Sequence, residues 1–331
     1  QPGHDRRGRG RRPERGQYRV KVLPATGDGQ SDRRPEEVLR RLQLTITRRL
    51  DGLLQGDYQA LLPKPGSEPG DSREYQEGDD VRRMDWAVTA RTTVPHVRDP
   101  VADRELESWA IVDCSASMDF GTANCEKRDL ALAAVAAIGF MTTRTGNRFG
   151  ALMVKPGGVT RIPSRPGQQP LMALLHKLAT RERVDGAGAT DLGAALVSHM
   201  VARRRRGLAV VVSDFLSPPG WERPLTGLCA RHQVLAVEVV DPRELELPNV
   251  GYLTLVDPET GRRMELQTAK PGIRQRYAEA AAAQRAEIAA AIRRSGAQHL
   301  VLRTDRDWLR DVVDFVLSAR RHRGGLQRVN R

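Results

Sequence analysis

The sequence predicts an α/β fold with a doubly wound, mainly parallel six-stranded sheet flanked by helices. Segments with the patterns of strands and helices alternate from residue 106 to residue 320, and parallel sheets are built from such alternation. Several strand segments, such as LAVVVSD at 208–214, are apolar at almost every position, which is typical of strands covered on both faces. The chain of 331 residues is also long enough to bury a large core.

The N-terminal part differs in composition from this alternating region. Residues 1–34 are rich in arginine and are expected to form a disordered tail. From Pro35 onward, apolar residues recur at helical spacing, which predicts an amphipathic helix with two glutamates at its favourable end. The residues of its apolar face are Val38, Leu42, Ile46, Leu50 and Leu53.

The remainder of the N-terminal region, which extends over 35–105, is expected to be largely irregular. Residues 55–75 are rich in glycine and proline and read as a connection. Trp86 and the alternating residues after it predict a short strand packed on the main body. Turn chemistry and ion pairing with the interleaved arginines account for the acidic residues of this stretch. These acidic residues are Asp79, Asp80 and Asp85.

The main domain is expected at 106–320. Its six strands are predicted at 106–113, 148–155, 158–164, 208–214, 232–241 and 298–304. Helices are predicted at 125–146, 168–180, 191–206, 273–294 and 305–320, and in part of 221–232. A hairpin elaboration at 250–270 turns at 257–261, and the long helix after it, ended by Ser295 and Gly296, returns the chain to the sheet. Residues 321–331 form a basic tail.

The net charge of +13 raises the question of nucleic-acid binding. Residues 1–19 contain seven arginines and two acids, and residues 320–331 contain five arginines and no acid. Most of the positive charge therefore lies in the two tails, which we interpret as solvated segments. Arginines 203–206 are interpreted as the end of a helix, where cations complement the dipole.

No stretch approaches the roughly 18 apolar residues of a membrane helix, and the start lacks the apolar core of a signal peptide. The sequence therefore predicts a cytoplasmic protein without a membrane span. Its three cysteines are too few and too scattered for a disulfide framework or a zinc site. Cys114 has no matching histidine pattern and is interpreted as a small buried residue.

A surplus of side-chain oxygens follows the first strand of the main domain. IVDCSASM at 111–118 places Asp113, Ser115 and Ser117 at the strand's carboxyl end, whereas a helix cap would need only one of them. With the strand order 3-2-1-4-5-6, the first and fourth strands flank the crevice where such sheets bind ligands. The fourth strand ends at Asp214, and a glycine-rich loop places Thr190 at the start of a helix between them.

Two carboxylates brought together in this way need a compensating cation. Magnesium prefers oxygen ligands, keeps several waters and accepts only one or two carboxylates directly. The three hydroxyls and two carboxylates therefore predict a site for Mg²⁺ or Mn²⁺. An ion with so few direct carboxylates keeps an open position for an acidic side chain of another protein.

These residues resemble a known site. DCSAS, the threonine of GATDL and the aspartate of VVVSD are similar to the metal-ion-dependent adhesion site of von Willebrand factor A domains, whose pattern is DxSxS followed by a distant Thr and a distant Asp. By that resemblance the metal positions are Asp113, Ser115, Ser117, Thr190 and Asp214. The stretch REYQEGDDVRRMDWAVTAR at 73–91 resembles the signature of bacterial proteins classed as domain of unknown function 58, which carry such an A domain. Many A domains have glycine after the last aspartate, and Phe215 here is expected to narrow access to the ion.

The resemblance implies a non-enzymatic adaptor or co-chaperone that works with a MoxR-type AAA+ ATPase. The ion would bind an acidic residue on that ATPase or on its client. Two alternatives are nucleic-acid binding through the arginine-rich tails and, less favoured, a metal-dependent hydrolase. The hydrolase is disfavoured because Ser115 stands where an aspartyl phosphatase needs a second acid, and because the sequence has no GxSxG elbow and no phosphate-binding glycine loop.

Overall fold

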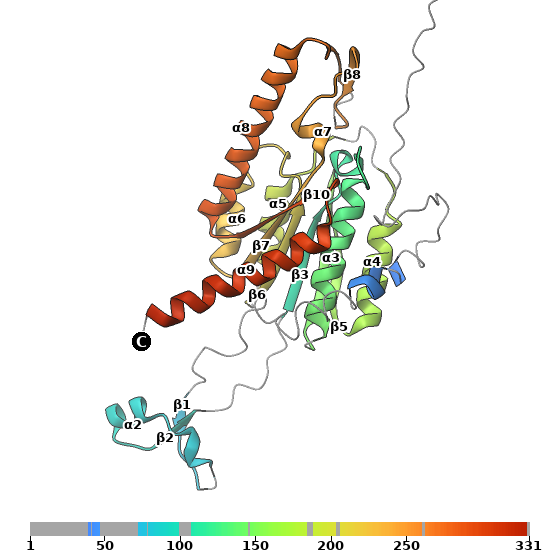
Figure 1. Ribbon diagram of the computed structural model, residues 1–331. Helices are drawn as coiled ribbons and strands as arrows, with labels where there is room; N and C mark the ends of the chain where they lie inside the picture. Colours follow the sequence, from blue (N-terminus) through green and yellow to red (C-terminus); the bar gives the residue numbers. More distant parts are fainter. Residues whose placement is uncertain are drawn as a thin grey trace, which may run out of the picture.

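Six strands form the central sheet in the computed structural model of the chain (Figure 1). The structure describes residues 39–40, 42–46, 72–77, 79–98, 107–144, 146–183, 188–202, 206–259 and 262–329. The strand order is β10-β7-β6-β3-β4-β5, and all neighbours are parallel except β4 and β5. The strands are β3 Glu107–Asp113, β4 Arg148–Lys155, β5 Gly158–Pro166, β6 Gly207–Ser213, β7 Gln233–Val240 and β10 Gln298–Arg303. The predicted order and fold class are confirmed.

Helices cover both faces of this sheet, as Figure 1 shows. On β3, Ala110 and Val112 belong to the core under α3, α4 and α9, whereas Trp109 and Ile111 belong to the core under α5, α6 and α8. This alternation explains why the strand is apolar at successive positions. The helices are α3 Lys127–Thr143, α4 Gln168–Ala179, α5 Leu192–Ala202, α6 Glu222–Cys229, α8 Pro271–Ser295 and α9 Trp308–Val329.

Helix α3 connects β3 to β4 and is almost wholly buried. Its alanine-rich sequence favours a helix and fits closely against the sheet. A capping box fixes its start, because Glu126 and Asp129 accept hydrogen bonds from each other's backbone N–H groups. The next residue after this cap, Lys127, therefore enters the helix at the carboxyl edge of the sheet.

The Asp129 carboxyl in this cap predicts a dependence of stability on pH. Burial, followed by the charge of Glu126, raises the pKa of Asp129 to about 6. Between its ordinary pKa and about 6, the folded protein binds more protons than the unfolded chain, so stability falls as pH rises through this window. Asp129→Asn removes this fall. Relative to wild type, the free energy of unfolding of the variant is therefore expected to rise by about 1 to 3 kcal/mol on going from pH 4 to pH 7. Urea unfolding of both proteins at pH 4 and pH 7 measures the difference in their free energies of unfolding. A difference that is the same at both pH values would contradict this expectation.

The segment 72–98 forms a small unit with its own two-stranded sheet. Strands β1 Ser72–Glu74 and β2 His96–Arg98 pair antiparallel, with helices η2 Val81–Arg83 and α2 Trp86–Thr92 between them. The predicted strand at Trp86 is therefore wrong. Asp85 accepts hydrogen bonds from two backbone N–H groups and starts α2 there, and the Trp86 side chain is 70% exposed.

The interpretation of the three aspartates in this unit agrees with the contacts. Asp79 forms a bidentate ion pair with Arg73 at 2.7 Å, Asp80 caps η2 and Asp85 caps α2. The hydrogen bonds from Arg73 lower the pKa of Asp79 to about 2. The acidic residues of this stretch thus act in local turns.

The N-terminal helix is described only at 39–40 and 42–46, where the chain is helical and Leu42 and Ile46 are buried as predicted. Residues 1–38, 41 and 47–71, among them the predicted face residues Val38, Leu50 and Leu53, lie outside the described residues. At the other end, α9 continues to Val329 instead of ending at residue 320, so most of the predicted basic tail is helical; arginine favours helix. Among the described residues, no helix combines the length and the apolar character that a membrane crossing needs.

The predicted hairpin elaboration is present between β7 and α8. Strands β8 Tyr252–Val256 and β9 Arg263–Gln267 pair antiparallel. A short helix that the sequence reasoning missed, α7 Pro242–Leu245, precedes the hairpin and starts from a capping box of Asp241 and Glu244. Figure 1 shows α7 and the hairpin at the carboxyl end of the central strands, so both lie on the side of the sheet where the candidate site was predicted.

Candidate metal centre

The two predicted aspartates lie at the carboxyl ends of adjacent parallel strands. Asp113 ends β3, and Asp214 directly follows β6, which pairs with β3 in register. The chain leaves these strands in opposite directions across the sheet, since β3 leads to β4 and β6 leads to β7. Asp113 is 2% exposed and Asp214 is 1% exposed. Both carboxyls are therefore buried at the point where strand order reverses.

The loop after β3 supplies the two serines. The backbone N–H of Ser115 donates to Asp113 Oδ1 at 3.0 Å, and the hydroxyls of Ser115 and Ser117 are 3.0 Å apart. Cys114, between Asp113 and Ser115 in the sequence, is buried, and burial raises the pKa of its thiol to about 11. The structure thus agrees with the interpretation of Cys114 as a buried residue, and a thiol with this pKa is a poor nucleophile at neutral pH.

The loop before α5 supplies Thr190, which is buried. Its hydroxyl donates to Asp113 Oδ1 at 3.1 Å. Ser213, the last residue of β6, donates to Asp113 Oδ2 at 2.7 Å. The Ser117 hydroxyl helps to hold down the pKa of Asp214, which places it beside that second carboxyl. The structure thus brings together all five predicted residues, from three loops far apart in the sequence.

A buried lysine also takes part, and the sequence reasoning missed it. The Lys127 ammonium, with none of its side chain exposed, donates to Asp214 Oδ2 at 2.8 Å and also binds Glu244 of α7. Burial would raise the pKa of Asp214, but the charge and hydrogen bond of Lys127 hold it below its ordinary value. Burial, followed by the charge of Asp214, raises the pKa of Asp113. The two carboxyls therefore have different electrostatic surroundings.

Arg285 of α8 adds a second cation to the charged residues around Asp214. Its guanidinium donates to the carbonyl of Asp214 at 2.8 Å and forms ion pairs with Glu238 and Glu244, each at 3.0 Å. Helix α8 is thus tied directly to the loop that carries Asp214.

The charged group as a whole contains more acid than base. Asp214, Glu238 and Glu244 form ion pairs with Lys127 or Arg285, and the imidazole of His299 binds Glu238 at 2.8 Å. Asp113 accepts hydrogen bonds from hydroxyl and backbone N–H groups instead, beside the carboxyl of Asp214. Two buried carboxylates in their charged forms are costly without a further cation, and a divalent ion would supply that charge.

The donor set fits a hard divalent cation. In the described part of the chain, no group of three or more His, Cys, Asp or Glu residues has the geometry of a metal site. The predicted centre is of another kind, with two carboxylates and three hydroxyls, and oxygen ligands of this type suit Mg²⁺ or Mn²⁺. Because Lys127 already neutralises Asp214, that carboxylate fits contact through a water better than direct coordination. The binding of an ion itself stays a prediction.

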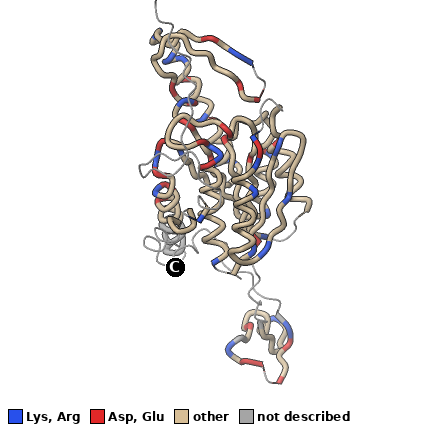
Figure 2. The backbone as a smooth tube through the Cα atoms, turned by 90° about the vertical axis from the view of Figure 1, so that its right-hand side faces the viewer, with Lys and Arg blue, Asp and Glu red and all other residues tan. Residues whose placement is uncertain are grey.

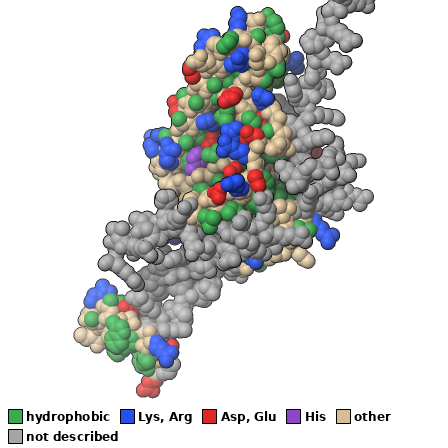
Figure 3. Space-filling view, viewed as in Figure 1, with side chains coloured by type: hydrophobic (Ala, Val, Ile, Leu, Met, Phe, Trp, Pro, Cys, Tyr) green, Lys and Arg blue, Asp and Glu red, His purple; other side chains and the backbone are tan. Residues whose placement is uncertain are grey.

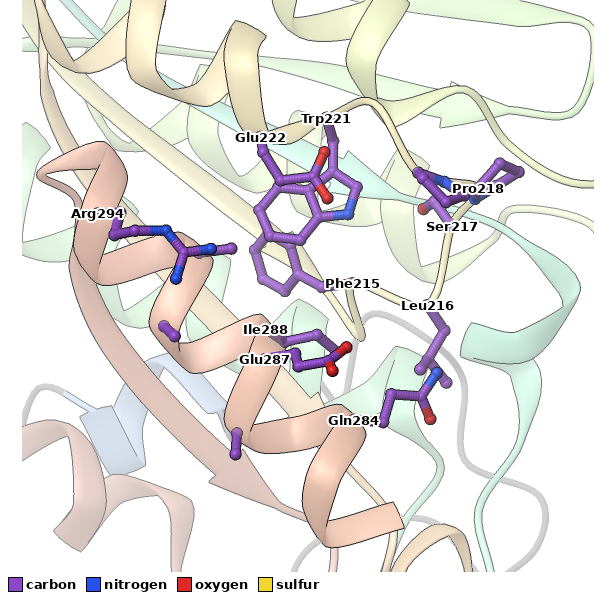
Figure 4. A pocket seen from close by; sticks show the side chains of 14 residues that line it. Phe215, Leu216, Ser217, Pro218, Trp221, Glu222, Gln284, Glu287, Ile288 and Arg294 are labelled. Carbon is purple, nitrogen blue, oxygen red and sulfur yellow. The ribbon is translucent and has the colours of Figure 1, made fainter. Parts of the chain in front are cut away.

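The loop after Asp214 departs from what the sequence led us to expect. Phe215 has φ of 57°, a left-handed conformation that suits glycine. Its ring is 3% exposed and packs on Trp221 at 5.0 Å between ring centroids. It lines, with Arg294 and other residues of α8, a pocket of about 650 Å³ (Figure 4). The phenyl group therefore belongs to this packing, and the structure gives no sign that it covers the five-residue site.

Two signals in the sequence point to the missed residues. Asp241 and Glu244 form a D-P-R-E capping box after a buried strand, which predicts a helix start there. Lys127 is one of three consecutive charged residues, with Arg128 and Asp129, at the start of an otherwise apolar helix. Neither signal shows that Lys127 reaches both Asp214 and Glu244, because those contacts depend on how α3 and α7 lie across the sheet edge.

Comparison with known proteins gives a family match. A family model described as "Protein of unknown function DUF58" matches residues 71–287. An uncharacterized protein of Mycobacterium tuberculosis is 56% identical over 283 residues, which cover 86% of this chain and 89% of the relative. An uncharacterized protein of Mycobacterium avium is 48% identical over 163 residues, 49% of this chain and 96% of the relative.

Two solved structures are similar at a lower level. The conserved hypothetical protein BatB from Bacteroides thetaiotaomicron has 15% identity and a TM-score of 0.40, over 65% of this chain and 99% of that chain. A von Willebrand factor type A structure from Catenulispora acidiphila has 14% identity and a TM-score of 0.34, over 68% of this chain and 43% of that chain. Similarities of this size assign no function.

Proposed function

This chain belongs to the DUF58 family of proteins of unknown function, and from that premise we propose that it is a protein-interaction module, not an enzyme, whose binding depends on a divalent ion. The observation that carries the proposal is the meeting of three hydroxyls and two buried carboxyls, from three separate loops, at the carboxyl edge of the sheet. Separate turns and caps have no reason to converge in this way.

The five residues would contribute to Mg²⁺ or Mn²⁺ binding in different ways. The hydroxyls of Ser115, Ser117 and Thr190 would turn their lone pairs to the ion, and Asp113 would supply negative charge. Asp214, paired with Lys127, would contribute through a bound water. When bound, the ion supplies Lewis acidity at an open coordination position, which suits a carboxylate oxygen of a partner.

The partner in this proposal carries an acidic side chain on its binding surface. By the family resemblance it is a MoxR-type AAA+ ATPase, or a client of that ATPase, in the cytoplasm. The face in Figure 3 supports a protein partner over a nucleic acid, because among the described residues Lys and Arg side chains there stand next to Asp and Glu. The arginine-rich stretch 1–19 lies outside the described residues.

The test is affinity capture from a lysate of the native host. We expect the wild-type chain to retain the ATPase or its client in Mg²⁺ and to lose it in EDTA. Asp113→Ala is expected to reduce retention at least tenfold, because the buried carboxylate supplies negative charge to the ion. Asp314→Ala, which removes a carboxylate that is 67% exposed on α9, is the matched control and should behave as wild type.

Two results would count against the proposal. One is retention that is unchanged both in EDTA and in Asp113→Ala. The other is calorimetry in which a folded sample gives no heat with Mg²⁺ or Mn²⁺. Circular dichroism of each variant shows whether a loss of capture reflects unfolding.

A further inference from the structure

The turn of the β8–β9 hairpin carries an acidic residue that is shielded although its neighbours are not. Along the hairpin, Tyr252 is 77% exposed and Met264 is 61% exposed. Asp257 and Pro258, at the start of the turn, are also exposed, but Glu259 is only partly exposed. A carboxylate at a hairpin turn normally points into water. The shielding of Glu259 shows that its side chain lies against other groups.

The turn itself is held in one conformation. The backbone N–H of Asp257 donates to the carbonyl of Arg262 at 2.9 Å, and the N–H of Glu259 donates to Asp257 Oδ1 at 3.0 Å. At the other end of the hairpin, the buried hydroxyl of Thr268 donates to the carbonyl of Gly251 at 2.8 Å and accepts from the N–H of Val250 at 3.1 Å. The hairpin is therefore fixed at both ends, and the direction of Glu259 is set by its structure.

The hairpin lies at the edge of the sheet that carries the candidate metal centre. It follows α7, whose Glu244 binds Lys127, and both Figure 1 and Figure 2 draw it at that end of the domain. Electrostatics point the same way. Burial, followed by the charges of Asp214, Asp113 and Asp257, raises the pKa of Glu259, and Lys127 acts on it in the opposite sense. Apart from Asp257 in the same turn, the charged groups that act on Glu259 are those of the candidate metal centre.

We propose that Glu259 is an internal ligand of the ion at Asp113, so that the hairpin occupies the position that a partner's acidic side chain would take. This inference rests on the proposed function and adds its regulation: the partner must displace the chain's own carboxylate. A third acidic side chain beside two buried ones is unfavourable without a cation, and it becomes favourable when an ion is present to be shared.

The arrangement would set a threshold for partner binding. A carboxylate on the same chain is presented to the ion at an effective concentration of about millimolar or higher. A lone acidic side chain in solution cannot compete with that, whereas a partner with additional contacts can.

The test uses Mn²⁺ as the probe and the relaxation rate of water protons as the readout, with the full chain. In Glu259→Gln, we expect bound Mn²⁺ to gain about one exchangeable water and the relaxivity to rise accordingly. The affinity for Mn²⁺ should fall about threefold to tenfold, because one anionic ligand is lost. Millimolar acetate should then lower the relaxivity of the variant and leave that of wild type unchanged.

The matched control is Glu265→Gln, which removes the same charge from an exposed position of β9 and should behave as wild type. If Mn²⁺ binds and Glu259→Gln equals wild type in relaxivity and acetate response, the role of Glu259 is refuted and the proposed function stands. If Mn²⁺ binds to neither protein, the proposed function fails and this inference falls with it.

Discussion

Replacing Lys127 by methionine is expected to lower the free energy of unfolding by about 3 to 5 kcal/mol, the range for breaking a buried ion pair. The ammonium is wholly buried and donates to both Asp214 and Glu244. Methionine fills a similar volume but leaves Asp214 charged and without its cation in a site that is 1% exposed. Arg285 still binds Glu244, so the loss arises mainly at Asp214. Urea unfolding with linear extrapolation measures it.

A second substitution identifies the origin of this loss. Adding Asp214→Asn to Lys127→Met should recover part of the stability, because the uncompensated charge is removed, and the double-mutant cycle then gives a coupling above about 1 kcal/mol. Lys177→Met on α4, where the lysine is exposed, is the control and should change stability by less than about 0.5 kcal/mol. A loss below about 1 kcal/mol in Lys127→Met would show that the ion pair is unimportant.

The variant also bears on the metal site. If a divalent ion binds beside Asp113, the ion would supply positive charge that Asp214 lacks in Lys127→Met. Mg²⁺ should therefore raise the stability of the variant by more than it raises that of wild type, by the linkage between ligand binding and folding. An equal effect on both would argue that the ammonium and the ion act independently.

Gly207→Ala is expected to be the most damaging substitution of a small residue, with a loss of about 3 kcal/mol, at the upper end of the usual cost of overpacking. An added Cβ at Gly207 would lie 2.0 Å from the carbonyl oxygen of Glu107. The two residues are directly paired at the first positions of the central strands β6 and β3, so the clash involves the backbone of the strands that lead to Asp214 and Asp113.

The control for this substitution is Gly272→Ala in the first turn of α8. An added Cβ there meets nothing within 4 Å, so stability should be unchanged or rise by up to about 1 kcal/mol. Thermal and urea unfolding of the two variants provide the comparison. Equal stabilities would contradict the expectation for Gly207, and reduced Mn²⁺ binding by Gly207→Ala would show that strand position matters at the centre.

The sequence was sufficient for the sheet and for the grouping of the five residues. Strands β3 and β6 are largely apolar on both faces, and an aspartate ends β3 and directly follows β6. The alternation of strands with helices predicts the order that places them side by side. Knowing where each strand ends was enough to predict that these side chains lie together, because the carboxyl ends of parallel strands share one edge of the sheet. The distances to Asp113 from Ser115 and Thr190 follow from that placement.

The features that the sequence did not reveal depend on contacts between distant elements. Lys127 contacts Asp214 only because α3 begins at the carboxyl edge of the sheet, where Asp214 lies. The capping box of α3 predicts where the helix starts but not this contact. Trp86 was assigned to a strand because it is a large aromatic residue, whereas Asp85 before it caps a helix and leaves the side chain exposed. Glu259 belongs to a turn whose sequence predicts a hairpin but not the direction in which the hairpin points.

The outer edge of β5 limits how a partner can attach. Its sequence GVTRIPSRP places Pro163 and Pro166, which have no N–H to donate, and two arginines on a strand whose only partner in the described sheet is β4. Proline and basic side chains at such an edge oppose the addition of another strand. Recognition by strand addition is therefore opposed at this edge, and a protein that binds here has to contact side chains instead of pairing with the strand.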